Sequence, residues 1–146
     1  MGIIESIYIA ETAGGAMYAI PTATLIAGKG IEGDRYASLK GTFSDYVKDH
    51  ELTLVEAEVA EELGFAPGET RRNILTRGIR LNDLVGKRFH VGDALCEGTR
   101  FCEPCAYLEK VTERPGLVKQ MVGRGGLRAI IVEGGTVKLG DAVTKA

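Results

Sequence analysis

The stretch that decides the fold class, residues 85–99, reads VGKRFHVGDALCEGT. It contains two strand-like runs, 85–91 and 94–99, which the turn residues Gly92 and Asp93 join. A similar turn occurs near the C-terminus, where LGDAV at 139–143 nearly matches VGDAL at 91–95. The match does not extend into a repeat, so two similar turns explain it better than a duplication.

Working outward from this hairpin, most other segments are also typical of strands. Residues 27–35 contain three glycines, too many for a regular element, and predict a loop or a broken strand. The predicted strands are 2–10, 17–26, 52–54, 127–132 and 136–143, and the predicted helices are 55–63, 104–111 and 117–122. The sum predicts a mostly β (α+β) domain, barrel-like, with a few short helices packed on it.

Composition and length limit the classes of function that the chain can have. The chain has 146 residues, which fits one domain over 1–146, and 18 Lys and Arg against 20 Asp and Glu give a net charge of −2. That balance argues against a polyanion-binding protein. With no secretory leader and no apolar run of about 18 residues, we expect a cytoplasmic protein that does not span a membrane.

Charge is nevertheless uneven along the chain. Residues 45–69 carry eight acids and one base, whereas residues 71–88 carry six bases and one acid. This contrast predicts two electrostatically different faces, of which the basic one suits a phosphorylated ligand. An RNA-binding barrel that uses residues 71–88 is the weaker alternative, because few aromatic residues are interleaved there.

The three cysteines, Cys96, Cys102 and Cys105, are an odd number, which favours thiol chemistry or metal binding over a disulfide framework. In the sequence Cys102-Glu103-Pro104-Cys105, Pro104 suits a first helical turn, and a helix start favours the thiolate form of Cys105. Two alternatives remain open. One is a structural zinc site that recruits Cys96, Cys102, Cys105 and His90, and the other is a dithiol redox motif, whose βαβ setting is not visible here.

Two arginine-rich segments are candidate anion sites. Arg71-Arg72-Asn73 precedes an apolar run, and alternation places Arg71 and Asn73 on one strand face and Arg72 on the other. Arginine offers a rigid donor fork for phosphate, and asparagine offers a donor and an acceptor for a heterocycle. The segment 124–128, RGGLR, exposes backbone N–H groups between two arginines, and Lys29 and Arg35 flank the glycine-rich turn.

The joint pattern resembles the MOSC family, the domain found at the C-terminus of molybdenum cofactor sulfurases. The matching segments run through nearly the whole chain: 28–35 (GKGIEGDR), 54–56 (LVE), 70–74 (TRRNI), 91–94 (VGDA), 104–105 (PC), 124–126 (RGG) and 139–141 (LGD). The resemblance implies a stand-alone, single-domain member with a β-barrel and a role around the molybdenum cofactor (molybdopterin).

The same resemblance implies roles for individual residues. Cys105 matches the family's Pro-Cys position, which carries sulfur as a persulfide in sulfurase relatives and ligates molybdenum in reductase relatives. Arg71, Arg72 and Asn73 fall in the segment that binds the pterin, and Arg35 and Arg124 are phosphate contacts by position.

The chain lacks the pyridoxal phosphate-dependent desulfurase domain of the sulfurases. The resemblance therefore implies that pyridoxal phosphate acts only through a partner cysteine desulfurase, or that an electron-transfer partner is needed. The expected function is a sulfur carrier or a cofactor-binding redox module, hence sulfurtransferase-like or part of a cofactor-dependent reductase. A small zinc-binding structural or interaction domain is the alternative.

Overall fold

A computed structural model describes residues 2–12, 15–35, 37, 51–66, 68–101 and 124–146. Strands dominate, as predicted, with one α-helix and one 3-10 turn among these residues. In chain order the elements are β1 (Gly2–Ile9), β2 (Tyr18–Ala19), β3 (Thr22–Ile26), β4 (Gly30–Ile31), β5 (Leu52–Glu56), α1 (Ala57–Glu62), β6 (Ile74–Arg77), η1 (Leu81–Leu84), β7 (Arg88–Val91), β8 (Ala94–Phe101), β9 (Leu127–Glu133), β10 (Gly135–Lys138) and β11 (Ala142–Lys145). The predicted helices 104–111 and 117–122 lie outside the described residues.

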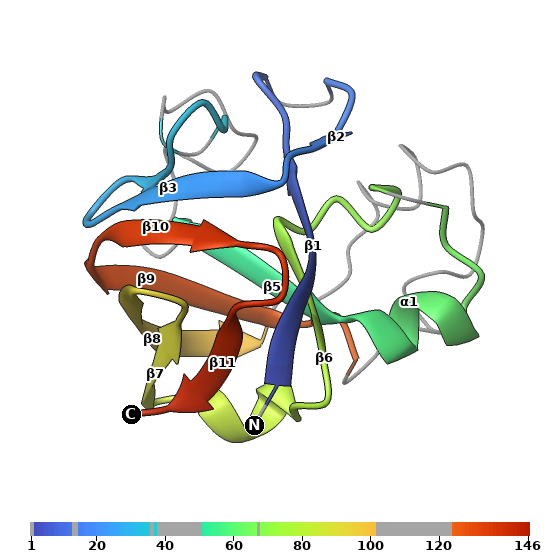
Figure 1. Cartoon of the computed structure of the whole chain (residues 1–146). Helices are drawn as coiled ribbons and strands as arrows, with labels where there is room; N and C mark the ends of the chain where they lie inside the picture. Colours follow the sequence, from blue (N-terminus) through green and yellow to red (C-terminus); the bar gives the residue numbers. More distant parts are fainter. Residues whose placement is uncertain (1, 13–14, 36, 38–50, 67, 102–123) are drawn as a thin grey trace.

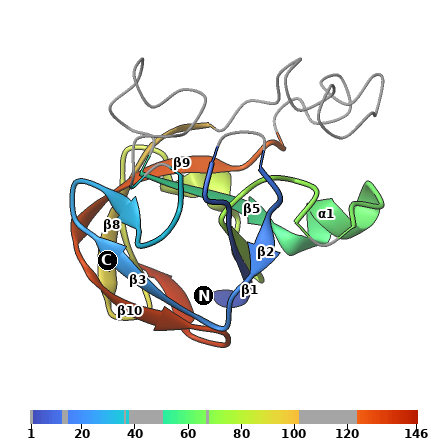
Figure 2. The same ribbon diagram turned by 90° about the horizontal axis from the view of Figure 1, so that it is seen from above.

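The larger sheet closes into a barrel. Its strands follow the order β11-β7-β8-β9-β5-β6-β1-β2, and β11 also pairs with β1, which closes a ring of seven strands. A second sheet, β10-β3-β4, lies beside the ring, and α1 lies outside it (Figures 1 and 2). The mostly β, barrel-like fold predicted from the sequence is confirmed.

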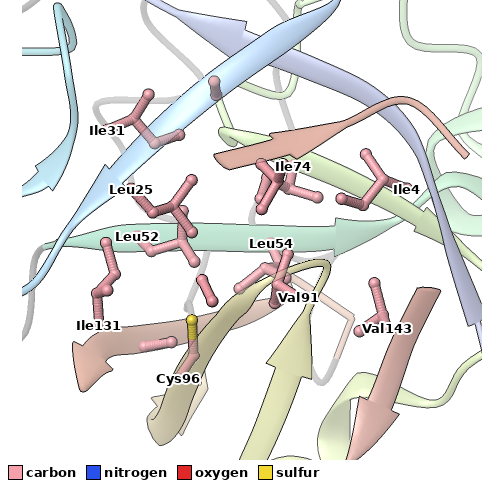
Figure 3. Close-up of a cluster of buried hydrophobic side chains, with 14 of the residues drawn as sticks. Ile4, Leu25, Ile31, Leu52, Leu54, Ile74, Val91, Cys96, Ile131 and Val143 are labelled. Atoms are coloured by element: carbon pink, nitrogen blue, oxygen red, sulfur yellow. The ribbon is translucent and has the colours of Figure 1, made fainter. Parts of the chain in front are cut away.

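The barrel interior is filled by alternate strand residues. Leu52, Leu54 and Ile74 point inward with Leu127 and Ile131, and all are at most 3% exposed. Figure 3 shows the same arrangement, with the sulfur of a buried cysteine in the cluster. Since successive strand residues face opposite sides, the residues between them face the outer wall.

A smaller apolar cluster covers part of that outer wall. The short helix α1 packs its buried Ala57 and Ala60 against Tyr8, Val55 and Leu75. These residues come from β1, β5 and β6, so the helix covers three neighbouring strands. The outer wall therefore has a covered apolar part here and a polar part farther along the strands.

Several predicted boundaries are wrong, and each error has a local cause. The predicted strand 136–143 is two strands, because Gly140 has a φ of +87° and Asp141 Oδ2 accepts the N–H of Lys138 at 3.0 Å, which makes a turn. The predicted strand 17–26 likewise divides into β2 and β3 around Pro21. The helix begins at Ala57 rather than at residue 55, since Val55 continues the parallel pairing of β5 with β6.

Candidate functional site

A polar row crosses the outer wall of the barrel over three adjacent strands. Register pairs Arg128 of β9 with Thr53 of β5, and Asn73, just before β6, bonds to Thr53 from the other side. All three residues are at most 8% exposed. Cross-strand neighbours share a face, so these three side chains, here called the polar row, lie side by side.

Asn73 joins the strands of this row. Its Oδ1 accepts the Thr53 backbone N–H at 3.2 Å and the Thr53 hydroxyl at 3.1 Å, and its Nδ2 donates to the Tyr8 carbonyl at 3.1 Å. Thr53 Oγ1 also lies 3.0 Å from the Asn73 backbone nitrogen. Asn73 therefore ties β5 to β1, and its predicted contact with a cofactor stays a prediction.

Arg72, next to Asn73 in the sequence, and Arg128 of the polar row have guanidinium nitrogens that no described residue accepts. Arg72 Nε donates to the Gly125 carbonyl at 2.9 Å and Nη1 to the Thr70 carbonyl at 3.3 Å, but Nη2 has no partner among the described residues. Arg128 Nε and Nη1 are also buried without a partner there. Each residue is only 8% exposed. A buried charged donor is costly unless an acceptor bonds to it, so each of these guanidinium groups is suited to an anion.

The turn before β9 brings these arginines to one end of the wall. Gly126 has a φ of +105°, and a Cβ on it would lie 2.0 Å from the Leu54 carbonyl oxygen. Only glycine allows this approach, which aims the Gly125 carbonyl at Arg72. The second glycine of the RGGLR segment, Gly126, thus has a structural reason.

Arg71 has an unusual backbone conformation. Its φ of +59° is the only positive value at a non-glycine position among the described residues. Its Nη1 donates to the Gly15 carbonyl at 2.8 Å. Strand alternation requires extended backbone, so at Arg71 it gives no basis for the predicted shared face with Asn73.

Arg35 forms a buried ion pair and hydrogen bonds within the fold. Its Nη1 donates to Asp34 Oδ1 at 3.0 Å in an ion pair whose two side chains are at most 5% exposed, and its Nη2 donates to the Arg71 carbonyl at 3.2 Å. Asp34 Oδ1 also accepts the Ala10 N–H at 3.0 Å. The pair thus holds the glycine-rich turn against β1, and a phosphate contact by Arg35 stays a prediction.

Arg124 reaches in another direction. Its Nη1 donates to Glu62 Oε2 of α1, and the two side chains are 37% and 64% exposed. This surface ion pair joins the helix to the turn before β9. The arginine of the RGGLR segment that enters the polar row is Arg128, which the sequence marked only as a flanking charge.

Two of the four predicted zinc ligands, Cys96 and His90, do not meet. Cys96 is buried in the barrel core (Figure 3), whereas His90 is exposed on β7 and pairs in register with Leu95 instead. The two side chains therefore lie on opposite faces of the wall and cannot hold one ion. Among the described residues no group of three potential metal ligands occurs, and Cys102 and Cys105 lie outside them.

Burial makes Cys96 a poor nucleophile. Desolvation, aided by the charge of Glu51, raises the pKa of its thiol to about 12. With Cys102 and Cys105 both replaced by serine, we expect Cys96 to react with a soluble aromatic disulfide at pH 8 at least about 100-fold more slowly than a free cysteine. The labelling rate should become high in denaturant. In the native protein it should rise with pH, because more of the thiol is then in the thiolate form. Fast labelling of the native double variant would contradict this burial.

Known proteins resemble the chain in fold and in sequence pattern. The MOSC domain family matches residues 46–144. The structure of the YuaD protein from Bacillus subtilis superposes with a TM-score of 0.78 at 22% identity, over 98% of this chain and 94% of that one. YiiM from Geobacillus stearothermophilus gives 0.76 at 17% identity, over 100% and 75% of the two chains.

YiiM from Escherichia coli has the same fold, with a TM-score of 0.71 at 18% identity over 99% of this chain and 69% of that one. No curated protein sequence matches the chain. The described helices include none that is long and apolar enough to cross a membrane.

Proposed function

The chain belongs to the MOSC domain family, whose members are related to molybdenum cofactor sulfurases, and from that premise we propose that it binds the molybdenum cofactor through the phosphate of the pterin. Arg72 and Arg128 hold the phosphate, and Cys105 is the reactive group. The observation that carries this proposal is the pair of buried guanidinium groups with nitrogens that no described residue accepts.

A phosphate monoester fits these donors well. Its oxygens accept several charge-assisted hydrogen bonds at once, which neutral ligands do not. Arg72 is already fixed by the carbonyls of Gly125 and Thr70, so its remaining Nη2 has a defined direction. The arginines therefore bind and orient the cofactor, and the chemistry of the metal itself comes with the cofactor when it is bound.

The sequence position of Cys105 supports a role at this end of the barrel. Phe101, at the end of β8, pairs with Leu127, the residue before Arg128. Cys105 follows Phe101 by four positions, a reach of about 14 Å at most. This short connection supports a reactive thiol that serves the ligand of the polar row.

Two activities are consistent with such a thiol. As a sulfur carrier, the Cys105 thiolate accepts the outer, sulfane sulfur of a persulfide on a partner cysteine desulfurase. The desulfurase cysteine is then released as a thiol. As part of a redox module, Cys105 would ligate the molybdenum through its thiolate, a soft ligand, and an electron-transfer partner would supply electrons. We propose a cytoplasmic location for either activity, and both depend on the same cofactor site.

Elemental and sulfur analysis of protein purified from a host that makes the cofactor tests the proposal. We expect molybdenum or pterin in the wild type, with cyanide-labile sulfur that disappears in Cys105→Ser if Cys105 carries a persulfide. Loss of molybdenum in Cys105→Ser, without labile sulfur in the wild type, would instead assign the redox activity. Stoichiometric zinc with chelator-induced unfolding, and no pterin, would support the zinc-binding alternative and overturn the proposal.

A further inference from the structure

A pocket separate from the polar row lies on the outer wall, where α1 packs against β1 and β6. It has a volume of about 170 Å³, and we call it the helix pocket. Tyr8, Leu75 and Ala60 line it, and Glu5 and Glu61 supply its carboxylates. The proposed cofactor site makes no use of these residues.

The size and lining of the helix pocket suit one ring. Apolar side chains from the outer cluster line it, including Phe65, which packs on that cluster. An apolar cavity of about 150 Å³ holds one benzene molecule. The helix pocket is thus large enough for a single six-membered ring and too small for a cofactor the size of a pterin dinucleotide.

The charged side chains at the helix pocket favour a positively charged ligand. Arg77 donates to both oxygens of Glu5, at 2.5 and 3.1 Å, and also to Glu61 Oε1. One cation against two carboxylates leaves this cluster with a charge of −1. Each carboxylate accepts up to about four hydrogen bonds, so both retain capacity for a further donor.

A tyrosine hydroxyl supplies a further hydrogen-bonding group at the helix pocket. Tyr8 is 7% exposed and lines the helix pocket. Its hydroxyl makes no hydrogen bond to any described residue, and its backbone bonds instead with Asn73. The hydroxyl oxygen is not among the buried side-chain atoms without a partner, so it is open to solvent and can bond to a ligand with a polar group.

We propose that the helix pocket binds a small organic cation, a protonated amine attached to one ring. The ammonium group lies against Glu5 and Glu61, and the ring packs on Leu75 and Phe65, whose aromatic face also attracts a cation. Thr70 connects this pocket to Arg72 of the proposed phosphate site, because it lines the pocket while its carbonyl accepts Arg72 Nη1. The amine therefore binds beside the proposed cofactor site rather than in it.

Calorimetric titration of the full chain with benzylamine, in buffer free of phosphate and cofactor, tests the proposal. We expect saturable binding of one benzylamine with a Kd of about 1 mM. Glu61→Gln should weaken binding about fivefold and Tyr8→Phe about threefold, because each removes one polar contact. Glu62→Gln is the matched control: it removes the same charge from α1 at a residue that does not line the pocket, and it should change the affinity less than twofold.

Benzyl alcohol supplies the neutral comparison and should bind at least about fivefold more weakly than benzylamine. The proposal is overturned by non-saturable heat with benzylamine, by equal losses in Glu61→Gln and Glu62→Gln, or by benzyl alcohol that binds as tightly as the amine. Because no phosphate or pterin is present, this result is independent of the proposed cofactor site.

Discussion

Replacing Arg128 with methionine should lower the affinity for inorganic phosphate about 100-fold while leaving the phosphate-free protein at least as stable as the wild type. The affinity falls because the change removes two buried N–H donors that no described residue accepts. The stability holds because methionine fills a similar volume without a buried charge in need of a partner. A merely structural arginine would show the opposite, a loss of stability with no change in phosphate binding.

Thermal unfolding with and without phosphate measures both effects. At about 100 times its Kd, phosphate should stabilise the wild type by about 2.7 kcal/mol, a rise in Tm of about 5–10 °C. The matched control is Arg88→Met, which removes the same charge from an arginine whose side chain is 56% exposed and pairs with Glu97. That control should keep the full phosphate-dependent rise in Tm. An equal loss of this rise in both variants would mean that it depends only on the net charge of the protein, which would contradict the phosphate site.

Gly126→Ala should destabilise the protein by about 3 kcal/mol or more, with a fall in Tm of about 10 °C. The new Cβ would lie 2.0 Å from the Leu54 carbonyl oxygen, and the φ of +105° already excludes most side chains. Backbone atoms cannot move aside as a flexible side chain can. The turn must therefore shift, and with it the Gly125 carbonyl that holds Arg72, so phosphate binding should weaken as well.

Gly140→Ala separates the clash from the backbone strain. Gly140 also has a positive φ, +87°, but nothing lies within 4 Å of the point that a Cβ would occupy. This control should cost only about 1–2 kcal/mol, the strain of the left-handed conformation itself, and should leave phosphate binding unchanged. Equal destabilisation of the two variants, measured by denaturant titration, would contradict the close packing of Gly126 on β5.

The sequence predicts the barrel class because its signals are local. The hairpin at residues 85–99 becomes β7 and β8, since alternating residues and a Gly-Asp turn act over a few neighbouring positions. Boundaries were missed where one residue changes the backbone, as at Gly140, or where pairing with a distant strand extends an element, as at Val55. Neither effect leaves a periodic trace in the sequence.

Part of the arginine and asparagine cluster is visible in the sequence for the same reason, and its role as a site stays a prediction. Arg72 and Asn73 are visible as a polar pair beside an apolar run, and the structure places both in or beside the polar row. Arg128 is not visible in this way, because its position opposite Thr53 arises only from the pairing of β5 with β9. The ion pairs of Arg35 with Asp34 and of Arg124 with Glu62 are likewise products of packing.

The pterin content of purified protein is the most direct measure of whether the buried arginines hold the cofactor. Wild type, Arg128→Met and Arg88→Met are isolated from a host that makes the cofactor, and the released pterin is oxidised and measured by its fluorescence. We predict comparable pterin in the wild type and Arg88→Met and at least about a tenfold lower amount in Arg128→Met. Equal pterin in all three proteins, or none in a folded wild type, would contradict cofactor binding by these arginines.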